Sequence, residues 1–367
     1  MTDFDSKPRL NLLDGLRGVA ALIVVVYHLF ECFDLSPIPR GYLAVDFFFV
    51  LSGFVIGYSY DDRWPRGLSA ATFFRRRLIR LHPLVIAGAV IGAVCFIAQG
   101  GTRWDGSSVS WTMIALATVA NLLMIPLWPS AAADVRGNGE MFPLNGPNWS
   151  LFFEYIGNIL YAILLRRMPT LWLALIAAAA GAGIVFIAIT DGYLGVGWTM
   201  ANGGLWQGTL RMLFSYVAGM LIARCHPKVN MSRQPLTCMA TLLTISVLPL
   251  TFGEMPVWAS GLYDAVCVTA VFPALVIIGA SSTSRQSKPL KLLGELSYPL
   301  YAVHYPLMYL FYAYIGFNGN LVPIARLEEV WPVAVALPFV AIILAWAVMK
   351  WWDNPIRRRL SGRRVRN

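Results

Sequence analysis

Long apolar segments recur along the whole chain, and each is close to the thickness of a bilayer's hydrocarbon core. A crossing helix needs about 20 apolar residues, and ten segments approach that length: 13–33, 42–60, 81–99, 148–165, 170–190, 205–224, 236–253, 257–280, 292–315 and 331–352. Charged residues make up only 13% of the 367 residues and apolar residues 57%, whereas a soluble domain carries about 25% charged residues. The sequence therefore predicts an all-α polytopic membrane protein. It argues against a soluble enzyme, a disordered chain and a secreted disulfide scaffold.

The basic residues predict the orientation of these segments. The net charge is +10, and basic residues of membrane proteins gather in cytoplasmic loops, so the surplus does not point to nucleic acid. Ten crossings with both termini cytoplasmic place 24 of the 29 Lys and Arg residues on that side. The exceptions are Arg40, Arg103, Arg136 and Arg326, which fall outside, and Arg211, which falls within a segment.

Two further stretches are interpreted as helices that do not cross. The apolar stretch 111–128 predicts a re-entrant or surface helix on the outer side, because an eleventh crossing would put the basic tail 356–367 outside. Residues 66–80 predict a cytoplasmic amphipathic helix, with its apolar side chains toward lipid and the arginines toward water. The apolar residues are Phe73, Phe74, Leu78 and Leu81. We expect one transmembrane domain over 1–367 and no appended soluble domain.

Arg17 and His28 are polar residues in an otherwise apolar first segment. A charge at mid-membrane costs about 2.5–3.5 kcal/mol, which makes such a residue a functional candidate. Eleven positions separate the two, so they share one helix face about 16 Å apart along the axis, with Arg17 at the cytoplasmic end. The alternative is a capping arginine and a structurally hydrogen-bonded histidine.

Two carboxylates are predicted to join His28 in the outer half of the membrane. Asp46 lies just inside the second segment at a depth that matches His28, so we expect Asp46 to hydrogen-bond His28 and support its positive charge. Glu154 lies somewhat further inside the fourth segment and is expected in the same layer. The alternative for Asp46 is a carboxylate at the outer interface.

Other polar side chains are candidates for substrate contacts. Trp149 and Ser150 offer an indole N–H and a hydroxyl to a polar substrate or an oxyanion, although Trp149 also fits an interfacial anchor. His304 is either a second polar group of the cavity or a structural histidine. Ser52 is a further hydroxyl in the second segment.

Arg77 and Arg80 lie one helical turn apart where the third segment begins. Two guanidiniums at this spacing form a good phosphate clamp, although cytoplasmic charge alone would also explain them. The five cysteines are scattered and fit small apolar residues, and no Cys/His spacing predicts a metal site. Asp264 is a further buried carboxylate that the sequence does not connect to the others.

Taken together, these motifs resemble the membrane-bound acyltransferase-3 family along essentially the whole chain. The matching motifs are Leu13-Asp-Gly-Leu-Arg17-Gly followed by His28, Asp46-Phe-Phe-Phe-Val-Leu-Ser-Gly-Phe54, the Arg77-x-x-Arg80 pair before Pro83, Asn148-Trp-Ser-Leu-x-x-Glu154, Leu296-Ser-Tyr-Pro-Leu-Tyr-x-x-His304, and Asp353-Asn-Pro355. Arg17 and His28 match the family's essential pair, and Arg77 and Arg80 match its cytoplasmic arginine motif. Many members have Glu-Glu-Gln-Phe-Tyr after the Trp-Ser-Leu motif, whereas Tyr155 follows Glu154 here, so a second acid is absent.

The resemblance implies ten core helices in a bacterial inner membrane and transfer of an acyl group, with acetyl expected, from cytoplasmic acyl-CoA. The acceptor would be a hydroxyl of a glycan, a lipid-linked saccharide or a related molecule, and membrane lipids surround the protein. Arg17, Arg77 and Arg80 would hold the CoA phosphates, while His28 would act as general base. Direct transfer and an acyl-enzyme on Ser52, Ser150 or His28 both remain open.

Two other classes of function also fit the buried polar residues. A transporter of an acylated lipid or sugar would use His, Asp and Glu as a proton relay. A signalling or scaffold protein would need these groups only for structure.

Overall fold

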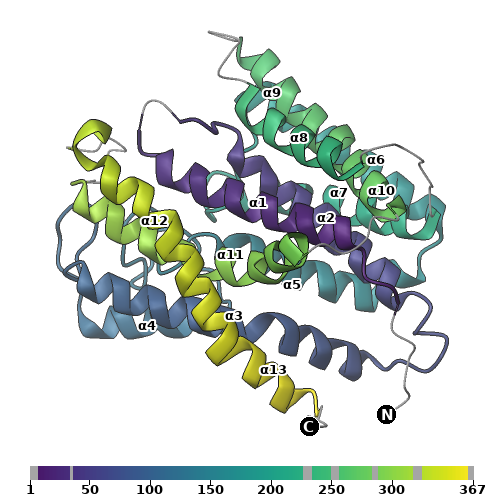
Figure 1. Ribbon diagram of the computed structural model, residues 1–367, viewed down its shortest axis with the longest axis horizontal. Coiled ribbons are helices and arrows are strands. Elements are labelled where there is room, and N and C mark those ends of the chain that lie inside the picture. The colour runs from purple at the N-terminus through teal and green to yellow at the C-terminus, as the bar shows by residue number, and fades with distance from the viewer. Residues whose placement is uncertain are drawn as a thin grey trace.

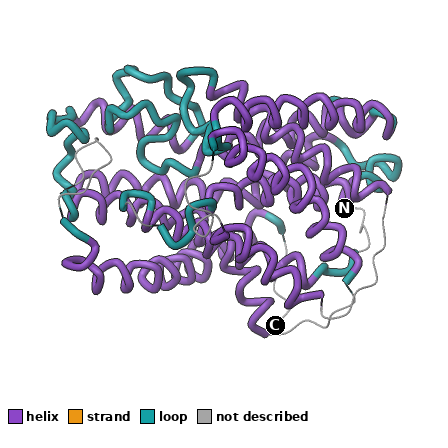
Figure 2. Tube along the Cα trace, turned by 90° about the horizontal axis from the view of Figure 1, so that it is seen from above, coloured by secondary structure: helices purple, strands orange, loops and turns teal. Residues whose placement is uncertain are grey.

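The computed structural model describes residues 7–33, 36–225, 234–248, 256–282, 288–316 and 325–362. Within these ranges the regular structure is helical and contains no strand. Most helices run along the long axis of the molecule (Figure 1). Much of the loop backbone gathers toward the left of Figure 2, and α1 finishes at this same end of the molecule in Figure 1. Six basic residues that the topology prediction places in the cytoplasm lie outside the described residues: Lys228, Arg233, Arg285, Arg363, Arg364 and Arg366.

The helices follow the predicted apolar segments closely. The long ones are α1 (Asn11–Phe30), α2 (Ala44–Tyr60), α3 (Ala70–Ala98), α5 (Asn148–Ile163), α6 (Thr170–Asp191), α7 (Gly204–Cys225), α11 (Lys288–Tyr314) and α12 (Leu327–Val348). The shorter ones are α4 (Trp111–Leu122), α8 (Gln234–Val247), α9 (Val257–Val266), α10 (Phe272–Ser281) and α13 (Asn354–Leu360). The 3₁₀ turns η1 (Gly41–Leu43) and η2 (Leu165–Arg167) flank α2 and α5, and the π-helical turns η4 (Cys267–Val271) and η5 (Met349–Asp353) lead into α10 and α13.

A helix occupies each of the ten predicted segments, although segment 236–253 runs past the end of α8 into residues that are not described. Six stretches of the described chain are long and apolar enough to cross a membrane: Asn11–Phe30, Gly41–Tyr60, Ala70–Ala98, Thr170–Asp191, Val257–Ser281 and Leu327–Leu360. The polytopic all-α membrane class is therefore confirmed. The number of crossings and their direction stay predictions.

The helix expected near 111–128 is the short helix α4. Its 12 residues extend about 18 Å, which is too short for a hydrocarbon core of about 30 Å. The Ser110 hydroxyl caps its first turn by accepting from the Met113 N–H at 3.3 Å. The helix packs along the second half of α3 (Figure 1), which fits a helix that does not cross the bilayer by itself.

The separate amphipathic helix expected at 66–80 does not exist as such, because these residues begin the 29-residue helix α3. The Ser69 hydroxyl caps the helix by accepting from the Thr72 N–H at 3.2 Å, and the helix continues past Pro83. Of the four residues expected to face lipid, Leu78 is exposed and Phe74 is half-buried, but Phe73 and Leu81 are buried inside the protein. Arg77 and Arg80 are therefore carried to an internal cavity on one continuous helix, whereas Arg75 stays exposed.

Glycines bring the backbones of the central helices into contact. A Cβ atom on Gly53 of α2 would lie 1.9 Å from the Tyr216 carbonyl oxygen of α7, and one on Gly219 would lie 2.0 Å from the Val50 carbonyl oxygen. A Cβ on Gly18 of α1 would lie 2.6 Å from the backbone of Leu293 on α11. Small residues permit such close helix packing in membranes. The helices that carry Arg17, His28 and Asp46 are thereby fixed against their neighbours.

Candidate functional site

Two cavities lie along α1, and Tyr301 and Val45 line both of them. The arginine cavity, of about 150 Å³, contains Arg17, Arg77, Arg80, Ser52 and Glu154. The His28 cavity, of about 260 Å³, is lined by His28, Glu31, Glu140 and Arg211 and by eight aromatic side chains, Tyr27, Tyr42, Trp104, Trp149, Trp198, Tyr305, Tyr309 and Tyr312, besides Tyr301. Arg17 lies near the start of α1 and His28 in its last turn, so the two cavities lie toward opposite ends of this helix.

Arg17 is anchored on one side and available on the other. Its Nε donates to the Ser297 hydroxyl at 2.8 Å and its Nη2 to the Gly294 carbonyl at 2.8 Å. Nη2 also lies 3.1 Å from the Asp14 carboxylate. A guanidinium has five N–H donors, and Nη1 makes no hydrogen bond to any described residue. These contacts fix the position of the guanidinium in the cavity wall.

Glu154 lies in the arginine cavity, so its expected place beside His28 was wrong. Its carboxylate accepts from Arg77 Nη2 at 2.7 Å and from the Ser52 hydroxyl at 3.0 Å. The physical reason is the depth at which α5 begins. Gly146 and Pro147 just before it line the His28 cavity, so counting residues from a membrane boundary placed Glu154 too near the surface.

Arg80 is the least engaged of the three guanidiniums. It makes no hydrogen bond or ion pair within the described part of the chain and lies 6.0 Å from the centre of the Tyr298 ring. Arg77 pairs with Glu154, but its Nε is buried without a partner among the same residues. The lining of the cavity thus holds three guanidiniums against one carboxylate, Glu154, with Asp14 paired to Arg17 outside the lining, and this surplus of positive charge favours an anionic ligand.

His28 pairs with Glu31, not with Asp46. Its Nδ1 lies 2.9 Å from Glu31 Oε2, and the other carboxylate oxygen accepts from Tyr312 at 2.7 Å and Tyr305 at 3.2 Å. The sequence interpretation missed Glu31. The available signal was its place three residues after His28, because such residues are neighbours on a helix surface.

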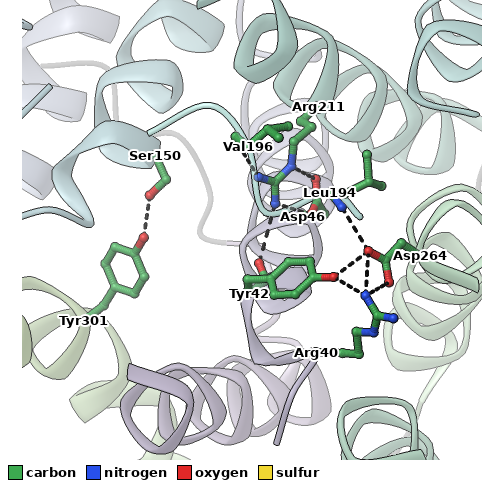
Figure 3. Close-up of polar contacts among 9 residues, drawn as sticks. All are labelled: Arg40, Tyr42, Asp46, Ser150, Leu194, Val196, Arg211, Asp264 and Tyr301. Carbon is green, nitrogen blue, oxygen red and sulfur yellow. Dashed lines mark hydrogen bonds and ion pairs between the residues drawn. The ribbon is translucent and has the colours of Figure 1, made fainter. Parts of the chain in front are cut away.

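Asp46 was predicted to support His28, and this prediction was wrong. Both of its oxygens bind Arg211 of α7, at 2.6 Å from Nη2 and 3.1 Å from Nε (Figure 3). Asp46 is fully buried and Arg211 nearly so, and a two-pronged charge-assisted pair is the strongest partner available to a buried carboxylate. The sequence did offer a sign of this pairing, because Arg211 was the one basic residue assigned to the interior of a predicted segment.

His304 is buried behind His28 and lines neither cavity. Its Nδ1 lies 2.9 Å from the Tyr301 carbonyl oxygen and 3.0 Å from that of Leu300, so Nδ1 is the donor. Its ring stacks on the His28 ring with 5.5 Å between centroids. His304 therefore supports the His28 ring from behind.

Trp149 and Ser150 face different cavities although they are adjacent in sequence. Trp149 lines the His28 cavity, with the Arg211 guanidinium 5.1 Å from its ring centre. Ser150 lines the arginine cavity, and its hydroxyl lies 2.5 Å from that of Tyr301 (Figure 3). The two residues therefore cannot bind one substrate group together as donors.

Asp264 belongs to a polar cluster beside the Asp46–Arg211 pair. It accepts from the Tyr42 hydroxyl at 2.5 Å and from the Leu194 N–H at 2.9 Å, and it pairs with Arg40 at 3.4 Å (Figure 3). These contacts join α9 to η1, just before α2, and to the loop after α6. The cluster has a structural role in holding one wall of the His28 cavity.

The segment between α4 and α5 forms another wall of that cavity. Arg136 is fully buried among Phe96, Trp104 and Tyr309, with its guanidinium 3.3 Å from the Tyr309 ring centre. Glu140 accepts from Tyr309 and from Asn138, and its burial raises the pKa of the carboxyl against the opposing effect of Arg136. In the described ranges no group of three His, Cys, Asp or Glu side chains is arranged to hold a metal ion.

Comparison with known proteins identifies the family to which the chain belongs. The family model described as "Acyltransferase domain" matches residues 10–350. The chain is 27% identical to the acyltransferase MdmB of Streptomyces mycarofaciens over 97% of its own length and 94% of that protein. It is 26% identical to the putative membrane-bound transacylase BcsY of Komagataeibacter xylinus over 83% and 74% of the two chains.

A third relative is longer than this chain. Identity to the peptidoglycan O-acetyltransferase OatA of Listeria monocytogenes is 24% over 83% of this chain and 50% of that protein, so the match spans about half of OatA. No solved structure matches the chain significantly. The family model covers most of the sequence, and the chain therefore belongs to the membrane-bound acyltransferase-3 family.

Proposed function

We propose that this membrane protein is an O-acyltransferase that takes an acyl group, with acetyl expected, from acyl-CoA. The acceptor is a hydroxyl of a glycan, a lipid-linked saccharide or a related molecule. The observation that carries the proposal is the pair of cavities along α1, one cationic and one built around a histidine–carboxylate pair. In this proposal the arginine cavity binds an anion, and His28 in the other cavity transfers a proton.

The arginine cavity is proposed to hold the phosphates of CoA. Arg80 has no hydrogen-bond or ion-pair partner in the described ranges, Arg17 keeps Nη1 available, and Arg77 lies one turn from Arg80. Guanidiniums bind phosphate through paired, charge-assisted hydrogen bonds. Arg17 and His28 lie about 16 Å apart along α1, which is close to the reach of the pantetheine arm that ends in the thioester.

The His28 cavity is proposed to hold the acceptor. Aromatic side chains dominate its walls, and carboxyl, amide and hydroxyl groups lie between them. Apolar walls with a few placed polar groups are typical of small-molecule sites. The O-acetyltransferase names of OatA from Listeria and Staphylococcus support a hydroxyl as the acceptor.

The proposed reaction is a direct transfer with His28 as general base. His28 Nε2 takes the proton of the acceptor hydroxyl while that oxygen attacks the thioester carbonyl. The tetrahedral intermediate then collapses, the carbon–sulfur bond breaks, and the CoA thiolate takes the proton back from the imidazolium. The products are the acyl ester and free CoA, and Ser52 and Ser150 need not be acylated.

The orientation of the protein in the membrane follows from the proposed donor. Because acyl-CoA is made in the cytoplasm, we propose that the arginine cavity opens there, with both termini cytoplasmic and the protein in a bacterial inner membrane. The helices of 1–367 would act as one domain.

A transporter of acylated lipid or sugar is the alternative function, and unlike an enzyme it would not break the thioester.

The test compares His28→Ala and Arg80→Ala in purified protein. Loss of a general base costs about 10²–10⁴-fold in rate, so His28→Ala should bind CoA almost normally and transfer almost nothing. Loss of a charged hydrogen bond costs about 1.5–3 kcal/mol, so Arg80→Ala should bind CoA weakly and regain turnover at high acyl-CoA. Arg75→Ala is the matched control, because Arg75 is on α3 but does not line the cavity.

Calorimetric titration of CoA and a transfer assay with labelled acetyl-CoA supply the two measurements. If His28→Ala loses CoA binding while Arg80→Ala keeps it, the donor lies in the other cavity and the mechanism is wrong. If wild-type protein releases no CoA from acetyl-CoA, the proposal that it is an enzyme using acetyl-CoA is wrong.

A further inference from the structure

We infer that Glu31 is a positioning residue, which holds His28 in the one ring orientation and tautomer that leaves Nε2 able to accept a proton. This inference rests on the proposed function of His28 as general base. The sequence predicted Asp46 for this role, whereas the structure favours Glu31, which lies at the same end of α1 as His28.

The first argument is the geometry of the pair. Nδ1 of His28 lies 2.9 Å from Glu31 Oε2, and an ionised carboxylate only accepts hydrogen bonds. In the neutral imidazole, Nδ1 therefore carries the proton and Nε2 carries the lone pair. Nε2 has no hydrogen-bond partner in the described chain, and the His28 side chain lines the cavity, so the basic nitrogen is available to a substrate.

The second argument is that Glu31 is itself held in place. Tyr305 and Tyr312 of α11 donate to its second oxygen at 3.2 and 2.7 Å. The Tyr312 hydroxyl also contacts the carbonyl oxygen of His28, which ties the end of α1 to α11. A carboxylate fixed by a neighbouring helix can fix a ring, whereas one that swings freely cannot.

The third argument is the lack of another orienting group among the described residues. The His28 ring has His304 stacked on one side at 5.5 Å and the Tyr305 ring edge-on at 4.6 Å between centroids. These contacts restrict the plane of the ring but do not choose which nitrogen carries the proton. Asp46 does not do so, because it makes no hydrogen bond to His28 and its carboxylate is held by Arg211 of α7.

The test uses Glu31→Gln, Glu31→Asp and a contrasting variant, Glu140→Gln. A glutamine amide can donate to Nδ1 and so favour the proton on Nε2, where it blocks proton acceptance. Glu31→Gln should therefore lower kcat by about 10²-fold or more, with CoA affinity and the acceptor KM close to wild type. Glu31→Asp keeps the acceptor-only carboxylate and should recover part of kcat.

Glu140→Gln changes a carboxyl of the same cavity that does not touch His28. It should act mainly on the acceptor KM. The opposite pattern, with Glu31→Gln raising the acceptor KM and leaving kcat within about threefold, would assign Glu31 to acceptor binding and overturn the inference.

A second readout does not depend on turnover. ¹⁵N NMR of histidine-labelled protein, with the His28 signals identified by their loss in His28→Ala, should show Nδ1–H in wild type and a shift toward Nε2–H in Glu31→Gln. Wild-type His28 with its proton on Nε2 would overturn the inference even if a variant failed to fold. Normal turnover in His28→Ala would instead sink the proposed mechanism, and this outcome is distinct from failure of Glu31 alone.

Discussion

The hydroxyl groups of Tyr301 on α11 and Ser150 on α5 lie 2.5 Å apart at the boundary between the arginine cavity and the His28 cavity (Figure 3). Both oxygens also lie near the Pro147 carbonyl, at 3.2 and 3.1 Å. The two hydroxyls have one proton each. One proton is donated in the hydrogen bond between the hydroxyls, and the other is donated to the Pro147 carbonyl. The pair is thus satisfied in a closed arrangement, and in the proposed mechanism the arm of acyl-CoA has to pass it to reach His28.

The first prediction concerns this boundary. Tyr301→Ala removes both the ring and the hydroxyl and should join the cavities, so hydrolysis of acetyl-CoA without acceptor should rise several-fold as water reaches the thioester. Ser150→Ala is the milder comparison, because Tyr301 keeps its contact with Pro147. Release of CoA measured without acceptor is the test. Unchanged hydrolysis in Tyr301→Ala would show that the pair does not separate the cavities.

The second prediction concerns the Asp46–Arg211 pair. Asp46→Asn leaves the Arg211 guanidinium buried without its counter-charge, and breaking a buried pair from one side costs about 3–5 kcal/mol. We expect a large loss of thermal stability in detergent and partial recovery in the double variant Asp46→Asn with Arg211→Met. An unchanged melting temperature with lost turnover would instead return Asp46 to a functional role.

A third prediction follows from Glu154, which lies beside Arg77 and not beside His28. Glu154→Gln removes a negative charge that competes with phosphate for the guanidinium, so CoA should bind several-fold more tightly and with a steeper dependence on salt. Ser52→Ala is the matched control, since it loses a hydrogen bond to Glu154 but no charge. If Glu154→Gln instead slowed turnover by about 10²-fold or more, as loss of a general base does, and left CoA affinity unchanged, Glu154 would belong to the chemistry.

A fourth prediction tests the direction of the chain in the membrane. In protein whose exposed Cys225 is changed to Ser, Arg359→Cys on α13 should react with an impermeant thiol reagent only from the cytoplasmic side. Ser107→Cys, in the loop before α4, should react only from outside. Both positions are exposed. Labelling of Arg359→Cys in intact cells would contradict the ten-crossing topology.

Local sequence was sufficient for the features that one helix contains. Apolar runs of bilayer length predicted where helices occur, because the cost of unpaired backbone in lipid permits few other structures there. Arg17 and His28 share α1, and Arg77 and Arg80 share α3, so helical periodicity alone put each pair on one face. The continuity of 66–80 with the segment 81–99 was missed, since one helix continues through the change from basic to apolar residues.

Tertiary structure decided the partners. Asp46 binds Arg211, which is 165 positions away, and Glu154 binds Arg77, which is 77 positions away. Hydropathy reports how apolar a segment is, but not how far a helix is rotated or how deep it starts. The segment before α5 enters the core, where Asn145 donates to the Ala302 carbonyl at 2.8 Å, and this depth moved Glu154 away from His28. The sequence determined the fold class and the spacing along single helices because those depend on near neighbours, whereas the pairing of buried charges depends on inter-helix contacts that only the packed molecule defines.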